Sequence, residues 1–442
     1  MIGPKSSLFL LLLVCIALGI ARGDFAPLRA VAPIGGGQSA PVQIEFWNGF
    51  TGPDGRVMLD LVRQFNRANS DVQVSMQRIL WATFYNKLMV SAVDGRGPEV
   101  FVLQSALLPR MDRAGIVDTV DDMFTDPAFV AEFEPSLLDR VNFGSGGKIR
   151  RIGVPLDTWP QGLYCNAEMF KAAGIVNADG SARPPTNARE FFADAKALER
   201  VSADGEQKVW GFGYGDWTYN FMSLVPQFHG RFLDESGNPT LDDPGNVAAL
   251  QFLADLNLKY HLAPSPEGGV AGWVGFRQQR VAMEFDGIYM VGDLKRLTGL
   301  DYIGAPLPQI GPYPGTLADS HILCIRKGLD DRRREAAKRF IRFLSDHSLT
   351  WADAGQVPAR KSARQSEAFK KLQVQYAFSK QLGYVMYPPK TALISELQLY
   401  LNFAVEKGIR GRTSAAAALH QANEDFKQFL EHDRQEQTAD EK

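Results

Sequence analysis

The chain has 442 residues, of which 45% are hydrophobic and 22% charged, an ordinary composition for a globular protein. Its formal net charge is −2, so no strongly basic field argues for binding nucleic acid or an anionic membrane. The length suffices for two or three domains with sizeable hydrophobic cores. We therefore expect more than one domain and no nucleic-acid partner.

An apolar stretch lies near the amino terminus. Lys5 precedes a run from Leu8 to Ile20 that is apolar apart from one glycine, and small residues follow at the positions a signal peptidase reads. The run is too short for a comfortable membrane anchor. We predict that residues 1–23 are a signal peptide of a protein exported to the periplasm, with a lipid anchor at Cys15 as the alternative.

Only two cysteines, Cys165 and Cys324, remain after such a cleavage. Two distant cysteines do not make a disulfide framework, which favours two buried free thiols. An oxidising compartment leaves a single bridge between them open.

The mature chain begins with residues 24–41, which are rich in Ala, Pro and Gly and predict a flexible lead-in. Residues 42–46 alternate like a half-buried strand, residues 58–65 have the apolar spacing of a helix that ends near Asn69, and residues 72–79 alternate again. This order of strand, loop, helix and strand is typical of an α/β domain.

Polar and aromatic residues follow the first predicted strands. Trp47, Thr51 and Asp54 lie in the loop after residues 42–46, and Gln104 closes the apolar strand 99–103. Because α/β sheets bind ligands at the carboxyl ends of their strands, these residues are candidates for ligand contact. The alternatives are that Trp47 is a core aromatic and that Asp54 caps the helix.

The segment 153–166, GVPLDTWPQGLYCN, combines several signals. Pro155 bars its strand from a central ladder position. Asp157 and Trp159 then place a carboxylate beside a large aromatic ring, and Pro160 stiffens the exit. We expect a polar, aromatic kink between two strands that forms one wall of a binding site.

Further candidates come from aromatic and basic residues later in the chain. Trp81 starts an aromatic cluster at helical spacing, and it is the member of that cluster expected to face the ligand. The full set of predicted ligand-binding residues is Trp47, Thr51, Asp54, Trp81, Gln104, Asp157, Trp159, Trp217, Trp273, Arg280, Asp286, Tyr289 and Arg360.

Several of these motifs resemble the extracellular solute-binding proteins of ABC-type sugar importers. The matching segments are the "FW…G" loop at 46–49, VP-D…G-LYCN at 154–166, PPT at 184–186, the group from Phe276 to Tyr289, and W…G-x-x-P-A-R at 351–360. Cys165 stands where the family usually has an aromatic residue. The resemblance covers roughly residues 42–430.

The resemblance implies an α/β fold of two lobes joined by three crossovers, near residues 154–156, 284–287 and 327–330. Lobe I would comprise 42–153 and 288–327, and lobe II 156–286 and 330–437. The lobes would close on a ligand by a hinge motion. The resemblance also implies a monomer that delivers its ligand to ABC permease subunits in the membrane.

The residues support binding more than catalysis. No histidine pair has metal-ligand spacing, no G-x-S-x-G motif occurs, and Asp319, Ser320 and His321 are strand neighbours that point to opposite faces. We therefore expect no enzyme, no metal and no cofactor. Indole and phenol rings with hydroxyl-pairing side chains favour a sugar or oligosaccharide ligand.

Two alternatives stay open. Arg280 and Arg360 allow glycerol-3-phosphate or another anionic polyol in the same fold. A secreted glycan hydrolase would need a pair of carboxylates that converge in the fold, which sequence spacing cannot test.

Overall fold

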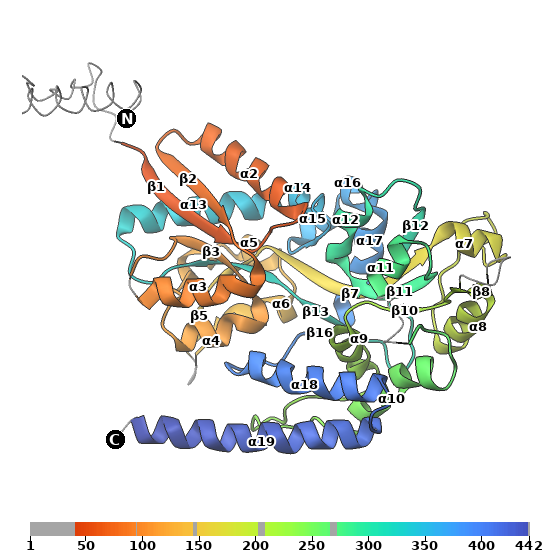
Figure 1. The fold of residues 1–442 in the computed structure, drawn as a ribbon. Coiled ribbons are helices and arrows are strands. Elements are labelled where there is room, and N and C mark those ends of the chain that lie inside the picture. The colour runs from red at the N-terminus through yellow and green to blue at the C-terminus, as the bar shows by residue number, and fades with distance from the viewer. Residues whose placement is uncertain (1–39, 94, 145–147, 202–207, 266–271, 441–442) are drawn as a thin grey trace, which may run out of the picture. The chain divides into compact units, whose positions relative to one another are not determined.

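The computed structural model describes residues 40–93, 95–144, 148–201, 208–265 and 272–440. From Pro41 onward the chain forms one compact unit, whose elements are labelled in Figure 1. The predicted signal peptide, the lipidation alternative at Cys15 and nearly all of the predicted lead-in lie outside the described residues.

The first of the two larger sheets has the strand order β2-β1-β3-β14-β6. Its strands are β1 (Val42–Asn48), β2 (Val72–Arg78), β3 (Val100–Gln104), β6 (Val154–Pro155) and β14 (His321–Ile325). β1 pairs in parallel with β2 and β3, whereas β14 runs antiparallel to β3 and β6. Together with α2 (Asp54–Ala68), this confirms the predicted opening of strand, helix and strand.

Alternating side chains give this first sheet two buried faces. Phe46 and Val102 pack on one face with α2 and α13 (Asp331–Asp346). Phe101 and Cys324 pack on the other face with α3 (Trp81–Val93) and α4 (Leu108–Arg113). The core thus follows from the two-residue period of the strands and the apolar stripes of the helices.

The second sheet is built around one long strand, β7. Its strands are β7 (Asp157–Asn166), β10 (Gly213–Tyr214), β11 (Met283–Gly287), β12 (Tyr302–Ala305), β13 (Thr316–Asp319), β15 (Val357–Pro358) and β16 (Val385–Met386). Four of them pair antiparallel with β7: β15 and β13 with its first four residues, and β11 and β12 both with the rest of the strand. All ten residues of β7 are buried.

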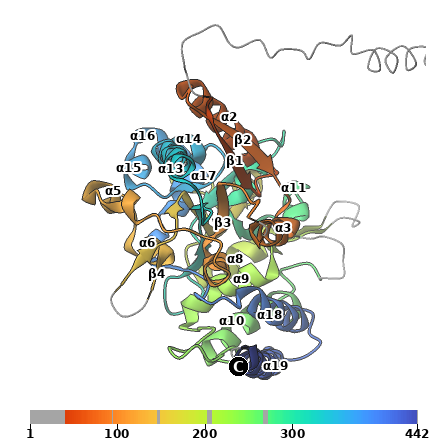
Figure 2. The ribbon, with the colours of Figure 1, turned by 90° about the vertical axis from the view of Figure 1, so that its left-hand side faces the viewer.

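Helices cover both faces of the second sheet. The core on one face includes Leu163 and residues of α8 (Ala188–Leu198), α9 (Trp217–Leu224) and α10 (Pro244–Leu258). α18 (Ile394–Ile409) and α19 (Ala415–Asp440) extend that core, and Figure 2 shows them running beside α10. Tyr164, the neighbour of Leu163, packs on the opposite face with residues of α17 (Gln373–Ser379).

Shorter elements connect these layers. The remaining helices are α5 (Pro127–Ala131), α6 (Pro135–Val141), α7 (Ala167–Ala172), α11 (Gly272–Arg277), α12 (Val291–Leu294), α14 (Ser348–Ala352), α15 (Lys361–Gln365), α16 (Glu367–Lys370) and α17 (Gln373–Ser379). Two small hairpins pair β4 (Asn142–Phe143) with β5 (Arg150–Arg151) and β8 (Arg200–Val201) with β9 (Lys208–Val209).

The strand pairings change two of the expected crossovers. The chain passes from the first sheet to the second at Leu156, between β6 and β7. However, β12 and β13 pair with β7, so the segment 302–319 lies in the second sheet and the chain returns to the first sheet only at β14. It remains there through α13, whose apolar face packs against β1, and re-enters the second sheet at β15. Segments 288–319 and 330–356 are therefore distributed differently from the predicted lobes.

The expected kink after Leu156 is also absent. Residues 157–166 form one continuous strand, which tolerates Pro160 because its partner changes along its length. Pro155 lies in β6 at the edge of the first sheet, where a missing N–H breaks no central ladder.

Both described cysteines are free thiols, each fully buried, as favoured from the sequence. Cys165 lies on β7 and Cys324 on β14, in the cores of different sheets. Among the residues that the structure describes, we find no helix with the length and apolar character needed to cross a membrane.

The buried carboxyl group of Glu284 on β11 is expected to make the stability of the folded protein depend on pH. Its side chain is fully buried, and neither carboxylate oxygen has a hydrogen-bond partner among the described residues. Burial, with Asp286 nearby, raises the pKa of Glu284 well above its usual value, and burial raises the pKa of Asp286 to about 7. The contribution of both carboxyl groups to the free energy of unfolding is fully present at a pH below their pKa values in the unfolded chain. It is lost as the pH rises through their higher pKa values in the folded protein.

We expect Glu284→Gln, which keeps the shape without the charge, to raise the free energy of unfolding by roughly 1–3 kcal/mol near pH 8. The difference should shrink toward pH 4, where both proteins carry a neutral group. Urea unfolding across this range measures it, with the exposed Glu235→Gln as the control. A variant less stable than the wild type at pH 8 would contradict this assignment.

Candidate functional site

Two adjoining cavities lie where the sheets meet. The larger has a volume of about 340 Å³ and the smaller about 300 Å³. Gln104, Trp159 and Tyr219 line both. We refer to the two cavities together as the cleft.

The first sheet contributes residues from strand ends to the cleft. Thr51 and Asp54 lie in the loop after β1 and at the start of α2, and Gln104 ends β3. His321 begins the antiparallel β14 directly opposite Gln104. Because β1 and β3 are parallel and β14 is antiparallel to them, all these positions meet at one edge of the sheet.

Trp81 reaches the larger cavity because the loop after β1 contains a glycine. A Cβ atom at Gly49 would lie 2.0 Å from Cδ2 of the Trp81 indole. Any larger residue at position 49 would displace the ring. The first residue of α3 thus packs directly on the loop that carries Thr51.

The second sheet supplies the opposite wall of the cleft. Trp159 lies on β7, Tyr219 lies in the first turn of α9, and Tyr289 lies in a short 3₁₀-helix (Ile288–Met290) that follows β11. The indole of Trp159 lies with its centroid 6.0 Å from each of the two tyrosine rings. Gln356 comes from the turn before β15.

Several buried polar atoms of the cleft have no partner among the described residues. They are the hydroxyl of Tyr85, Nε1 of Trp159 and Oε1 of Gln356. A buried polar atom without a hydrogen bond costs about 1–3 kcal/mol. A ligand whose polar groups reached these atoms would remove this cost.

The charge of the cleft is mainly acidic. Asp54, Asp293 and His321 line the larger cavity, and its lining includes no lysine or arginine among the described residues. Asp319 and Arg110 line the smaller cavity, where Arg110 forms an ion pair with Glu396 at 3.0 Å. Burial raises the pKa of both Asp54 and Asp319.

His321 is held from behind by a buried carboxylate. Its Nδ1 lies 2.9 Å from Oδ2 of Asp157, and its backbone N–H donates to Oδ1 of Asp157 at 3.0 Å. Nε1 of Trp351 on α14 donates to the same carboxylate at 2.7 Å. Asp157 is fully buried, so it orients His321 and does not itself reach the cleft.

Six of the predicted residues line the cleft: Thr51, Asp54, Trp81, Gln104, Trp159 and Tyr289. The alternative that Asp54 caps α2 is wrong, because the N-cap position is Pro53 and Asp54 is the first helical residue, whose Oδ1 accepts a hydrogen bond from the adjacent backbone N–H of Gly55. Of the aromatic cluster at the start of α3, Trp81 and Tyr85 line the cleft, whereas Phe84 is in the core.

The remaining predictions are corrected by the placement of the side chains. Trp47 is still part of β1 and packs among α3 and α4, with Nζ of Lys87 4.3 Å from its ring centroid. Trp217 starts α9 two residues before Tyr219, and this spacing directs them to different sides of the helix. Arg410 covers the ring of Trp217 at 5.2 Å.

Trp273, Arg280 and Asp286 also lie outside the cleft lining. Trp273 on α11 is 42% exposed, with the guanidinium of Arg277 over its ring. Arg280 lies in the turn after α11, where its backbone pairs with Gly275 and Trp210. Asp286 is buried in β11, and its Oδ1 accepts from the backbone N–H of Gly287 at 2.7 Å.

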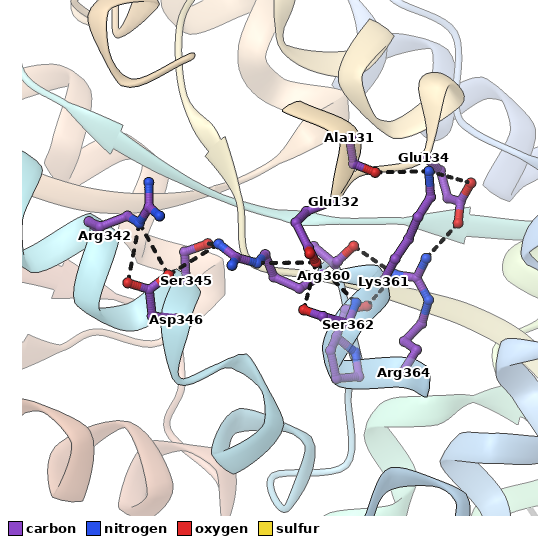
Figure 3. Close-up of polar contacts among 12 residues, drawn as sticks. Ala131, Glu132, Glu134, Arg342, Ser345, Asp346, Arg360, Lys361, Ser362 and Arg364 are labelled. Carbon is purple, nitrogen blue, oxygen red and sulfur yellow. Dashed lines mark hydrogen bonds and ion pairs between the residues drawn. The ribbon is translucent and has the colours of Figure 1, made fainter. Parts of the chain in front are cut away.

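Arg360 belongs to a network of ion pairs, shown in Figure 3. Its guanidinium contacts Glu132 at 3.4 Å and Asp346 at 3.1 Å, and it lies over the ring of Phe129. Neighbouring Arg364 pairs with Glu134. These carboxylates neutralise Arg360, so it serves packing between α5, α13 and α15 and is not available to a ligand in the cleft.

Four residues that line the cleft are not among those predicted from the sequence: Tyr85, Tyr219, His321 and Gln356. Tyr85 belongs to the aromatic cluster that Trp81 starts, and Tyr219 follows the predicted Trp217 by two residues. The positions of His321 and Gln356 depend on the antiparallel return of β14 and on the turn before β15, which no local pattern indicates.

A family model of the bacterial extracellular solute-binding protein matches residues 60–374. An arabinooligosaccharide-binding protein of Bacillus subtilis is 21% identical over 277 residues, which cover 59% of this chain and 56% of that protein. The sn-glycerol-3-phosphate-binding periplasmic protein UgpB of Agrobacterium fabrum is 24% identical over 170 residues, 37% of each chain. The chain thus spans at most about half the length of these curated relatives.

Solved structures share the fold over nearly their whole length. An ABC substrate-binding protein of Listeria monocytogenes in complex with cycloalternan has a TM-score of 0.74 at 20% identity, covering 88% of this chain and 99% of that one. The maltose/maltodextrin-binding domain of Bdellovibrio bacteriovorus bound to maltotriose has a TM-score of 0.72 at 19% identity, with 88% and 100% covered. The predicted two-lobed α/β fold is confirmed. With the family model spanning most of its length, this chain belongs to the bacterial extracellular solute-binding protein family.

Proposed function

We propose that this protein binds a neutral oligosaccharide in the cleft and delivers it to the permease of an ABC importer. The observation that carries the proposal is the lining of the cleft. Aromatic rings from both sheets line the cavities, and three of the lining residues, Tyr85, Trp159 and Gln356, carry buried polar atoms with no hydrogen-bond partner in the described part of the chain. Rings stack on the apolar faces of sugars, and the unpaired polar atoms meet their hydroxyls.

The proposed ligand-binding residues come from both sheets. They are Thr51, Asp54, Trp81, Tyr85, Gln104, Trp159, Tyr219, Tyr289, His321 and Gln356. We take the two sheets with their covering helices as the two lobes. A ligand that contacts both lobes favours the closed arrangement, which a permease then recognises.

The size of the cleft supports a ligand longer than one sugar. The volume of each of the two adjoining cavities lies near the lower end of the range found for ordinary ligand pockets. The names of the relatives point the same way, because the Bacillus protein is named for arabinooligosaccharides and the Listeria structure contains cycloalternan.

The charge of the cleft argues against glycerol-3-phosphate, despite the similarity to UgpB. A phosphate group is usually bound by arginine, lysine or a row of backbone N–H groups. The larger cavity offers two carboxylates and one histidine among its described lining residues, and Arg110 of the smaller cavity is already paired. Arg280 and Arg360, on which the alternative rested, lie elsewhere.

Thermal unfolding of the purified protein with maltotriose, mannobiose, arabinotriose and glycerol-3-phosphate tests the proposal. A ligand present at about 100 times its Kd stabilises the folded protein by about 2.7 kcal/mol, which raises the Tm by a few degrees. We expect this from at least one neutral oligosaccharide, with no shorter products by chromatography. Stabilisation by glycerol-3-phosphate alone would support the polyol alternative, and steady cleavage of the sugar would support the hydrolase.

A further inference from the structure

His321 occupies a position in the cleft where it can contact a solute directly. Its side chain is 8% exposed and lines the larger cavity. The imidazole stacks on Trp81, with centroids 5.7 Å apart and planes within 14°, and lies 6.2 Å from the ring of Trp159. The rings of both walls therefore hold the histidine in one orientation.

Asp157 determines which nitrogen of His321 carries a proton. The Asp157 carboxylate already accepts hydrogen bonds from the His321 backbone and the Trp351 indole, so it faces Nδ1 as an acceptor. Nδ1 is then the protonated nitrogen of the neutral ring. Nε2 has no hydrogen-bond partner within the described chain, and it is the nitrogen left for the solute.

The chemical character of Nε2 changes with the charge of the ring. In the neutral ring it is a hydrogen-bond acceptor, and in the imidazolium it is a donor. The charged groups around the ring are acidic: Asp157 from β7, Asp54 from α2 and Asp319 from β13. Burial opposes the imidazolium, but the charge and hydrogen bond of Asp157, with the charges of Asp54 and Asp319, outweigh it and raise the pKa of His321 above its usual value.

We propose that Nε2 of His321 hydrogen-bonds the bound saccharide and that proton uptake by this ring strengthens binding. Ring and glycosidic oxygens of a sugar can only accept hydrogen bonds, so they meet the imidazolium and not the neutral Nε2. A charged donor also makes the stronger bond. The inference rests on the proposed function, because it needs a saccharide in the larger cavity.

The test measures affinity and proton uptake together. Isothermal titration calorimetry of the purified protein with the tightest-binding of maltotriose, mannobiose and arabinotriose is run from pH 6 to pH 9. Two buffers of different ionisation enthalpy at each pH give the number of protons bound. For the wild type we expect proton uptake and affinity about tenfold weaker at pH 9 than at pH 6.

Two substitutions separate the two sides of the ring. In His321→Gln the amide nitrogen takes the place of Nε2, so this variant should bind with little pH dependence and without the proton uptake. In His321→Asn the shorter amide keeps a donor toward Asp157 and loses the solute contact, so affinity should fall about tenfold at pH 6. Thermal unfolding of both variants checks that they fold.

The outcomes distinguish this inference from the proposed function. A saccharide that binds with the same Kd from pH 6 to pH 9 and no proton uptake overturns the role of His321 and leaves the function standing. If binding to His321→Gln shows the same pH dependence as binding to the wild type, the proposed role of His321 is also overturned. The proton taken up on binding is then assigned to Asp54 or Asp319. If none of the three saccharides binds at any pH, the proposed function fails and this inference fails with it.

Discussion

Replacing Asp157 by alanine is expected to lower the free energy of unfolding by about 3–5 kcal/mol, because it leaves buried hydrogen-bond donors unpaired, one of which is charged whenever His321 is protonated. The carboxylate is fully buried and accepts three hydrogen bonds from His321 and Trp351. Alanine would leave these three donors unpaired in the core. Asp157, His321 and Trp351 lie on β7, β14 and α14, so the loss of these hydrogen bonds would loosen the junction between the sheets.

Asp157→Asn should cost less, because its amide oxygen still accepts part of this set while its NH₂ group opposes the remaining donors. Urea unfolding followed by circular dichroism measures both variants. Asp60→Ala is the matched control, since the Asp60 side chain is 65% exposed and forms a surface ion pair with Arg63, so the effect of this substitution should stay within about 0.5 kcal/mol. A loss below about 1 kcal/mol for Asp157→Ala would show that the carboxylate is not the hub of this junction.

The largest effect on binding is expected at Trp159. Its ring lines both cavities, contacts the rings of Tyr219 and Tyr289, and has an indole N–H without a hydrogen-bond partner among the residues that the structure describes. Buried tryptophans at the centre of an interface commonly contribute 2–4 kcal/mol when truncated to alanine. Trp159→Ala should therefore weaken binding of a neutral oligosaccharide by about 30-fold to 1,000-fold.

Trp159→Phe keeps an aromatic face and removes the N–H, so a loss of about fivefold to tenfold is expected from the missing hydrogen bond. Trp273→Ala is the matched control, because Trp273 is 42% exposed and lies outside the cleft lining. The affinity of Trp273→Ala for the oligosaccharide should stay within about twofold of the wild-type affinity. Calorimetry gives the affinities, and thermal unfolding verifies that each variant is folded. Equal losses at the two tryptophans would place the ligand elsewhere.

The elements with a strong local period could be predicted from the sequence. The apolar spacing of residues 58–65 and the alternation at 42–46 and 72–79 predicted α2, β1 and β2, because one face of each element must be buried whatever the fold around it. Pro155 likewise predicted an edge strand, since proline cannot donate to a central ladder.

Within the site, the residues at the ends of the early strands could also be predicted from the sequence. Thr51, Asp54 and Gln104 line the cleft because the carboxyl ends of parallel strands meet at one edge, a rule that needs only the order of elements. Trp47 was misplaced because β1 extends two residues beyond the predicted strand, to Asn48. Had β1 ended at Phe46, the ring of Trp47 would lie in the loop, but as part of the strand it packs in the core.

The local features of this protein follow from its amino-acid order: its α/β class, its opening elements, and a set of rings and polar side chains suited to a sugar. Which of these side chains share a cleft follows from the folding of distant segments against one another. His321 meets Trp159 and Asp157 across more than 150 residues of sequence, through strands that pair after long excursions of the chain. Such contacts depend on how strands far apart in the sequence pair and on which side of a helix a residue faces. The local sequence pattern predicts neither.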